Sequence, residues 1–166
     1  MSKKNKLNRG YAILELLFYI SFFTVFSLLV INAMIIMTKS FRETSIEGEW
    51  MQSGVIMERM SREVRASYGI NSISANDLKL NTKDSVGANK TVEFLLSGSN
   101  VQLLENNVLT GNLNTPNIIV NALSFTQITT VQGKAVKMTL TVRSKNDALN
   151  RTVDFYDTIV LRGDYQ

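Results

Sequence analysis

The sequence lacks cysteine and histidine altogether, and it has one proline and one tryptophan among its 166 residues. The missing cysteines exclude disulfide bonds, thiol nucleophiles and zinc fingers. The missing histidines exclude the side chain that most often performs acid–base catalysis near neutral pH. We therefore expect no catalytic residues and no cofactor, and we do not expect an enzyme.

The remaining candidates for chemistry do not form a known arrangement. Gly133-Lys134 is not a phosphate-binding loop, because Ala135 follows the lysine where the motif has serine or threonine. Asp154 and Asp157 lie close together in a predicted strand, but their odd spacing places them on opposite faces. We predict no metal site, while a calcium site assembled from carboxylates distant in the sequence stays open as an alternative.

Positive charge is concentrated at the start of the chain. Four of the 18 basic residues precede residue 11, and they are Lys3, Lys4, Lys6 and Arg9. The rest of the chain has 14 basic and 14 acidic residues, so the net charge of +4 belongs to this leader. A neutral domain lacks the basic surface that nucleic acids require, and we expect no nucleic-acid partner. The basic leader predicts a cytoplasmic N-terminus.

A long apolar run follows the leader. Residues 16–37 contain no charge, and their polar interruptions are Tyr19, Ser21, Thr24, Ser27 and Asn32. As a helix, this run spans roughly 33 Å, which is enough to cross a hydrocarbon core of about 30 Å. One acidic residue, Glu15, lies at its start. A carboxylate is costly in lipid, so its presence there indicates a function.

The order of residues around Glu15 resembles the processing signal of type IV prepilins. A basic leader is followed by Gly10, the aromatic Tyr11, three apolar residues, Glu15 and then the apolar helix. The family includes type IV pilins, minor pilins, and the pseudopilins of type II secretion and of DNA uptake in competence. The sequence departs from the family's pattern at two positions. The first mature residue is usually phenylalanine and is Tyr11 here, and the second is often threonine and is Ala12 here.

The resemblance implies a processing step and an assembly role. A prepilin peptidase would cut the Gly10–Tyr11 bond and add N-methylation at Tyr11. Glu15 would be the fifth mature residue, which in the family pairs with the N-terminal amine of an adjacent subunit as the filament grows. The implied partners are the prepilin peptidase, other pilin or pseudopilin subunits, the assembly platform of the inner membrane, and membrane lipid.

Two other interpretations explain part of the N-terminal pattern. A cleaved secretory signal has a shorter apolar core of about 7–15 residues and a small-x-small site, which Asn32-Ala33-Met34 does not provide. A plain membrane anchor explains the leader and the apolar run but gives Glu15 no role. Such an anchor would hold an extracellular binding module without a filament function, and this is the alternative prediction.

The helix is predicted to continue as an amphipathic half over residues 38–68. Apolar side chains recur at helical spacing at Trp50, Met57, Met60 and Val64. We expect this stripe to be buried in ordinary core packing while the charged side faces water. The segment 58–65 resembles the helix end of J-type and W-type minor pilins and pseudopilins, which carry a similar basic and acidic stretch before the sheet.

Beyond residue 68 the apolar residues alternate as in strands. The predicted strands are 70–74, 78–81, 91–96, 101–105, 108–110, one or two within 118–130, 135–143 and 152–162. Ser97-Gly98-Ser99-Asn100 predicts a hairpin. Asp157 interrupts the apolar face of the last strand, and we predict a bulge there. One long helix followed by consecutive strands predicts an α+β fold with an antiparallel meander packed on the helix.

These observations divide the chain into four segments. They are a leader at 1–10, a transmembrane helix half at 11–37, the amphipathic half at 38–68, and an antiparallel β domain at 69–166. The hairpin and the ending 159–163 also resemble J-type and W-type subunits. We expect a single-pass membrane protein whose C-terminal domain lies outside the cytoplasm and enters a filament after assembly.

Overall fold

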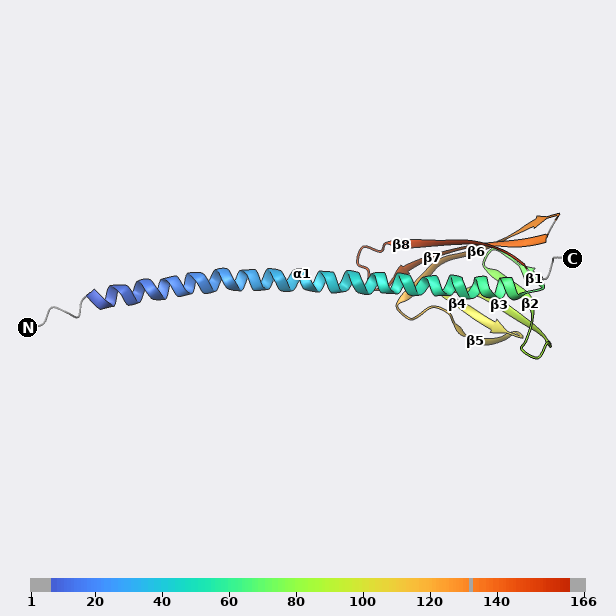
Figure 1. The fold of residues 1–166 in the computed structure, drawn as a ribbon, viewed down its shortest axis with the longest axis horizontal. Helices are drawn as coiled ribbons and strands as arrows, with labels where there is room; N and C mark the ends of the chain where they lie inside the picture. The colour runs from blue at the N-terminus through green and yellow to red at the C-terminus, as the bar shows by residue number, and fades with distance from the viewer. Residues whose placement is uncertain (1–6, 132, 162–166) are drawn as a thin grey trace, which may run out of the picture. The chain divides into compact units, whose positions relative to one another are not determined.

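The computed structural model describes residues 7–131 and 133–161, which form one helix and eight strands (Figure 1). The fold is α+β, as predicted, with a long N-terminal helix and antiparallel sheets. Helix α1 (Leu7–Ala66) is continuous. The chain forms two compact units, Met1–Thr44 and Ser45–Gln166. Residues 1–6 of the predicted leader and 162–166 of the predicted β domain lie outside the described residues.

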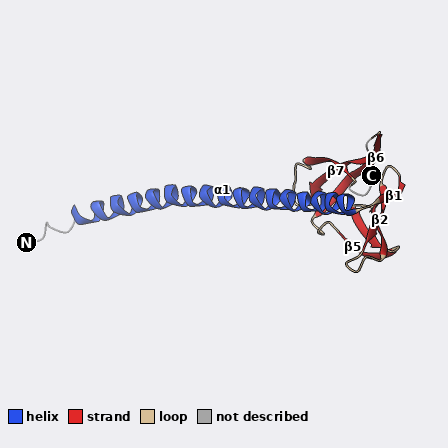
Figure 2. Cartoon of the chain, turned by 45° about the vertical axis from the view of Figure 1, so that its right-hand side comes forward, coloured by secondary structure: helices blue, strands red, loops and turns tan. Residues whose placement is uncertain are grey.

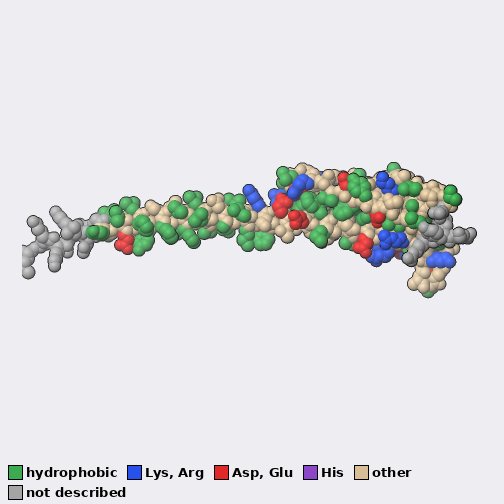
Figure 3. All heavy atoms as spheres, turned by 45° about the horizontal axis from the view of Figure 1, so that its top comes forward, with side chains coloured by type: hydrophobic (Ala, Val, Ile, Leu, Met, Phe, Trp, Pro, Cys, Tyr) green, Lys and Arg blue, Asp and Glu red, His purple; other side chains and the backbone are tan. Residues whose placement is uncertain are grey.

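In the first unit, α1 exposes its apolar side chains. Every residue between Tyr11 and Met37 is exposed except Ser27, which is half-buried. The space-filling view shows apolar side chains gathered along this part of the helix (Figure 3). By length and composition, α1 is a candidate membrane span near the N-terminus, which agrees with the predicted single-pass membrane protein.

Two threonine hydroxyls of this unit find partners within the helix. The Thr24 hydroxyl donates to the Ile20 carbonyl at 2.8 Å, and the Thr38 hydroxyl donates to the Met34 carbonyl at 2.8 Å. Bonds of this kind satisfy a hydroxyl without water. Thr24 and Thr38 are therefore compatible with a helix that faces lipid.

In the second unit, α1 covers a hydrophobic core with one face. Its buried apolar residues are Ile46, Ile56, Met57, Met60 and Val64. The predicted stripe is confirmed for the two methionines and for Val64, whereas Trp50 is half-buried. A helix that is apolar on one face only is typical of packing against a sheet.

Outside its buried face, this helical segment carries two ion pairs at helical spacing, of which the first is half-buried and the second exposed. Arg59 pairs with Glu63 at 2.8 Å, and Arg62 pairs with Glu58 at 3.0 Å. Pairs of this spacing contribute about 0.2–0.5 kcal/mol each to helix stability. They keep the charged side of the segment in water while the opposite face is buried.

The strands form two antiparallel sheets, where the sequence predicted a single meander (Figure 2). The first has five strands in chain order: β1 (Gly69–Ile73), β2 (Asp77–Lys83), β3 (Asn89–Ser97), β4 (Asn100–Glu105) and β5 (Val108–Asn112). The second has three: β6 (Ile118–Thr130), β7 (Gly133–Ser144) and β8 (Thr152–Val160).

The chain passes from one sheet to the other at a buried amide. Asn114 Oδ1 accepts a bond from the Val101 backbone N–H in β4 at 3.0 Å, and Asn114 Nδ2 donates to the Ile118 carbonyl in β6 at 2.9 Å. A buried amide is costly unless it is hydrogen-bonded, so these bonds fix the crossing. Asn114 thus connects the two sheets where the ladder of paired strands is interrupted.

The helix and both sheets share one core. Fully buried side chains come from each of them, such as Met60 on α1, Phe94 on β3 and Met138 on β7. The predicted alternation on β7 is confirmed, because Val136, Met138, Leu140 and Val142 are all buried. Each sheet therefore buries one face, and α1 contributes its buried stripe to the same core.

Most turn and strand predictions agree with the structure. Gly98 has a positive φ of 60° in the tight turn between β3 and β4. Asn106 and Asn107 have positive φ values of 51° and 66°, which suit the two-residue turn between β4 and β5. The segment 118–130 is a single strand of 13 residues. The last strand ends at Val160, and Arg162 lies outside the described residues.

The predicted bulge at Asp157 is wrong. Strands β7 and β8 pair without a shift of register, and Asp157 lies opposite Met138. Asp157 faces the helix, where it accepts a hydrogen bond from the Ser61 hydroxyl at 2.5 Å. A polar residue on the inner face of β8 is thus explained by a polar partner on α1.

Candidate functional site

The N-terminal residues that the sequence singles out all lie on α1. The Gly10–Tyr11 bond falls within the helical range, and the side chain of Tyr11 is 74% exposed. Glu15 follows about one turn later and is also exposed. The helix therefore presents the tyrosine and the carboxylate to the surroundings and buries neither of them.

Glu15 has a hydrogen-bonding partner on its own helix. The Tyr19 hydroxyl donates to Glu15 Oε1 at 3.1 Å, and the two residues are four apart. Side chains at this spacing are neighbours on a helix surface, so the local geometry brings them together. Sequence reasoning noted Tyr19 only as an amphipathic interruption, although its spacing from Glu15 was the signal for this contact.

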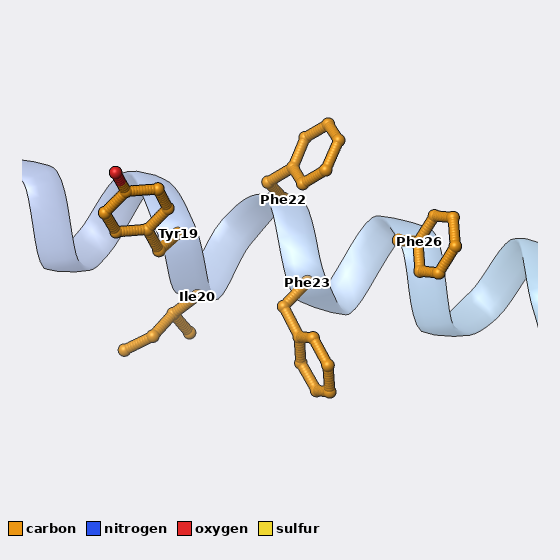
Figure 4. A pocket seen from close by; sticks show the side chains of 5 residues that line it. All are labelled: Tyr19, Ile20, Phe22, Phe23 and Phe26. Carbon is orange, nitrogen blue, oxygen red and sulfur yellow. The ribbon is translucent and has the colours of Figure 1, made fainter.

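An aromatic cluster continues from Tyr19 along the helix. A shallow hollow on α1 is lined by Tyr19, Ile20, Phe22, Phe23 and Phe26 (Figure 4). The close-up shows that these side chains project from different sides of the helix, with the Tyr19 oxygen as the one polar atom among them. A hollow formed by exposed apolar side chains on one helix is suited to lipid or to another apolar helix.

A second polar group in the described residues attaches the β7–β8 loop to α1. The carboxylate of Glu49 is buried, and it accepts hydrogen bonds from the Ser144 hydroxyl and from Asn146 Nδ2, the latter at 2.8 Å. Burying a carboxylate is costly unless it is hydrogen-bonded, and these two donors supply the bonds. Sequence reasoning missed this group, because Glu49 and its partners are about 95 residues apart.

The same loop also contacts the only tryptophan. The Arg151 guanidinium lies 5.1 Å from the centre of the Trp50 ring, within the range of a cation–π contact. Arg151 Nε donates to Asp147 Oδ2 at 2.9 Å, and hydrogen bonds from Arg151 lower the pKa of Asp147 to about 2. The carboxylate of Asp147 therefore belongs to the β7–β8 loop and is hydrogen-bonded to Arg151 within it.

One carboxylate on the five-stranded sheet is less well satisfied. Asp77 Oδ1 is buried without a hydrogen-bond partner. Burial raises the pKa of Asp77, nearby Glu93 raises it further, and Lys79 acts in the opposite direction. Lys79 itself pairs with Glu93 at 3.1 Å. Asp77 therefore combines a buried oxygen that has no hydrogen-bond partner with a neighbouring carboxylate, Glu93, that pairs with Lys79.

The structure brings no cluster of carboxylates together that could hold a metal ion among the described residues. Within 7–131 and 133–161 there is no group of three or more acidic side chains able to hold a metal ion. Asp154 and Asp157 lie on opposite faces of β8, as predicted, since Asp157 bonds to Ser61 and Asp154 accepts from Thr141 at 2.6 Å. The N-terminal group around Glu15 therefore remains the leading candidate site.

Comparisons with family models, with curated proteins and with solved structures found no match to this chain.

Proposed function

We propose that this chain is a structural subunit of a type IV filament system, as a minor pilin or a pseudopilin. The observation that carries the proposal is the position of Glu15, five residues after Gly10 and the one charged residue between Tyr11 and Met37. The exposed apolar surface of the first unit supports it, because such a surface requires lipid or neighbouring helices around it.

The proposed mechanism begins in the membrane. The basic leader keeps the N-terminus in the cytoplasm, and the second unit lies on the other side. A prepilin peptidase cleaves the Gly10–Tyr11 bond and methylates the amine of Tyr11. This cleavage places a positive charge within about one helical turn of Glu15.

Assembly then pairs charges between subunits. The amine of one subunit meets the Glu15 carboxylate of the next, on the inner-membrane assembly platform. Each charge is costly alone in a medium of low dielectric constant and less costly when paired, so a misplaced subunit is penalised. The apolar side chains gain little on moving from lipid to a filament core, and packing with this pairing sets the order of subunits.

The intact mass and N-terminal sequence of the membrane-extracted protein test the processing step. With a prepilin peptidase co-expressed, we expect a chain that starts at methylated Tyr11, and without it a chain that keeps its leader. Replacing Gly10 with a bulky residue should block cleavage, whereas Gly48, which lies on an open part of α1, should accept alanine with normal processing. A chain that keeps its leader despite an active peptidase would favour a membrane-anchored binding module.

Glu15→Ala tests the assembly step separately. This variant should be processed normally, because the cleaved bond is intact, and it should be lost from the filament fraction. Incorporation at the wild-type level would rule out the assembly role of Glu15 and leave the processing result standing.

A further inference from the structure

The carboxylate of Glu15 has one hydrogen-bonding partner among the side chains that the structure describes. This partner is the hydroxyl of Tyr19, which donates to Oε1 at 3.1 Å. The bond leaves the second carboxylate oxygen, Oε2, without a partner within the described residues. Of the two carboxylate oxygens of Glu15, Oε1 is therefore hydrogen-bonded and Oε2 is still able to accept a bond.

The hydroxyl of Tyr19 differs from those of Thr24 and Thr38 in what it binds. Thr24 and Thr38 donate to backbone carbonyls of their own helix, which satisfies only the threonine itself. The longer side chain of Tyr19 reaches past the backbone to a side chain one turn away. A hydroxyl that donates to a carboxylate forms a stronger bond than one that donates to a neutral group.

The environment of this segment increases the importance of the bond. Tyr19 and Glu15 are both exposed on a helix that is a candidate membrane span, where water is not available to complete their hydrogen bonds. Tyr19 lines the same hollow as Phe22, Phe23 and Phe26, and its oxygen is the one polar side-chain atom of that group (Figure 4). Tyr19 is thus placed to support Glu15 without adding a charge.

We propose that Tyr19 is a positioning residue for the docking of a second subunit. Its hydroxyl holds Oε1 of Glu15 and leaves Oε2 open to the N-terminal amine of the incoming chain. A carboxylate has acceptor sites for both donors, so the tyrosine stays bound when the amine arrives. This inference rests on the proposed function, in which that amine is the partner of Glu15.

Filament incorporation of full-length variants tests the role. Tyr19→Phe keeps the ring and removes the hydroxyl, and we expect normal processing with an incorporated fraction that falls about tenfold, the factor of one ordinary hydrogen bond. Tyr19→Gln supplies an amide donor at the same spacing and should recover part of the loss. Thr24→Val is the matched control, because it removes a hydroxyl that bonds only to its own helix, and it should incorporate normally.

A spectroscopic measurement tests the contact without any filament. The mature protein is labelled with ¹³C at glutamate side-chain carboxyls and placed in detergent micelles, and Glu15→Gln identifies the resonance of Glu15. We expect Tyr19→Phe to move this resonance and Thr24→Val to leave it in place. A resonance that does not move in Tyr19→Phe, or that moves while incorporation stays at the wild-type level, would overturn the positioning role.

The two measurements separate this inference from the proposed function. If Glu15→Ala enters filaments normally, the proposed function fails, whatever the resonance shows. If Glu15→Ala is excluded from filaments and Tyr19→Phe behaves as the wild type, the proposed function stands and the role of Tyr19 is rejected.

Discussion

The two parts of α1 both carry apolar surface that must be kept from water, and they differ in what covers it. In the first unit, apolar side chains surround the helix and are exposed, such as Phe23 at 70% and Leu29 at 62%. In the second unit, α1 buries one apolar face, on which Met60 and Val64 are fully buried, although Met51 on the same part of the helix is exposed. The second unit covers its apolar surface with its own sheets, while the first requires a partner from outside the chain.

This difference indicates where stability and function are located. Burial of the stripe in the second unit lowers the free energy of that unit alone, so it should fold whether or not other subunits are present. The exposed surface of the first unit adds nothing to folding in water and becomes useful only in lipid or in an assembly. Substitutions in the two regions should therefore affect different measurements.

The largest expected effect is a matched pair of methionine substitutions on α1. Met60 is fully buried, whereas Met51 is 79% exposed. Met60→Ala should lower the free energy of unfolding of the second unit by about 2–5 kcal/mol through loss of burial and creation of a cavity. Met51→Ala should change it by less than about 0.5 kcal/mol.

Urea unfolding followed by tryptophan fluorescence checks this pair, because Trp50 is the only tryptophan and belongs to the second unit. Phe23→Ala in the first unit should leave the same transition unchanged. A transition that shifts equally for Met60→Ala and Phe23→Ala would show that the two units do not unfold separately.

A smaller effect is expected at the polar attachment of the β7–β8 loop. Glu49→Ala removes the acceptor of the Ser144 hydroxyl and the Asn146 amide, and it should destabilise the second unit by about 1–3 kcal/mol. Glu47→Ala, two residues earlier and exposed, should have little effect. Equal midpoints in urea for the two variants would indicate that the buried carboxylate does not stabilise the loop.

The smallest expected effect is a pH dependence of the free energy of unfolding of the second unit. The pKa of Asp147 is lowered to about 2 in the folded protein, below the ordinary value of 3.8. The contribution of Asp147 to the free energy of unfolding is therefore fully present above about pH 4, and it is lost as the pH falls towards 2. Asp147→Asn should flatten the acid side of the stability curve.

Asp77, in the same unit, should change stability with pH in the opposite direction to Asp147. Its pKa is raised in the folded protein, so its contribution is present below the ordinary value of 3.8 and is lost as the pH rises through the folded pKa. Asp77→Asn should therefore increase stability at neutral pH relative to the wild type. Urea midpoints of both variants between pH 2 and pH 7 measure the two slopes, and slopes of the same sign would contradict this assignment.

Local patterns were sufficient to predict much of this fold. The helical spacing of Met57, Met60 and Val64 predicted the buried stripe, and the alternation on β7 predicted its inner face. Both depend on residues within a few positions of each other, where the period of the backbone alone decides which side chains share a face. The hairpin at Gly98 is equally local.

Contacts between distant residues were not predictable in the same way. Asp157 was assigned to a bulge because its partner, Ser61, lies 96 residues earlier. The separation into two sheets depends on Asn114, whose bonds to Val101 and Ile118 are not evident from any periodic pattern. At the candidate site, the resemblance to prepilins singled out Gly10, Tyr11 and Glu15, and their roles stay predictions because they depend on partners outside this chain.

The bonds from α1 to the C-terminal strands also determine when the second unit can complete its folding during synthesis. Ser61 and Glu49 are translated early, but their partners Asp157 and Ser144 follow 96 and 95 residues later. At about 5–20 residues per second, the ribosome needs roughly 5–19 s to supply them. During that interval the future buried face of the helix lacks part of its cover, so the second unit can complete its core only after its last two strands have emerged.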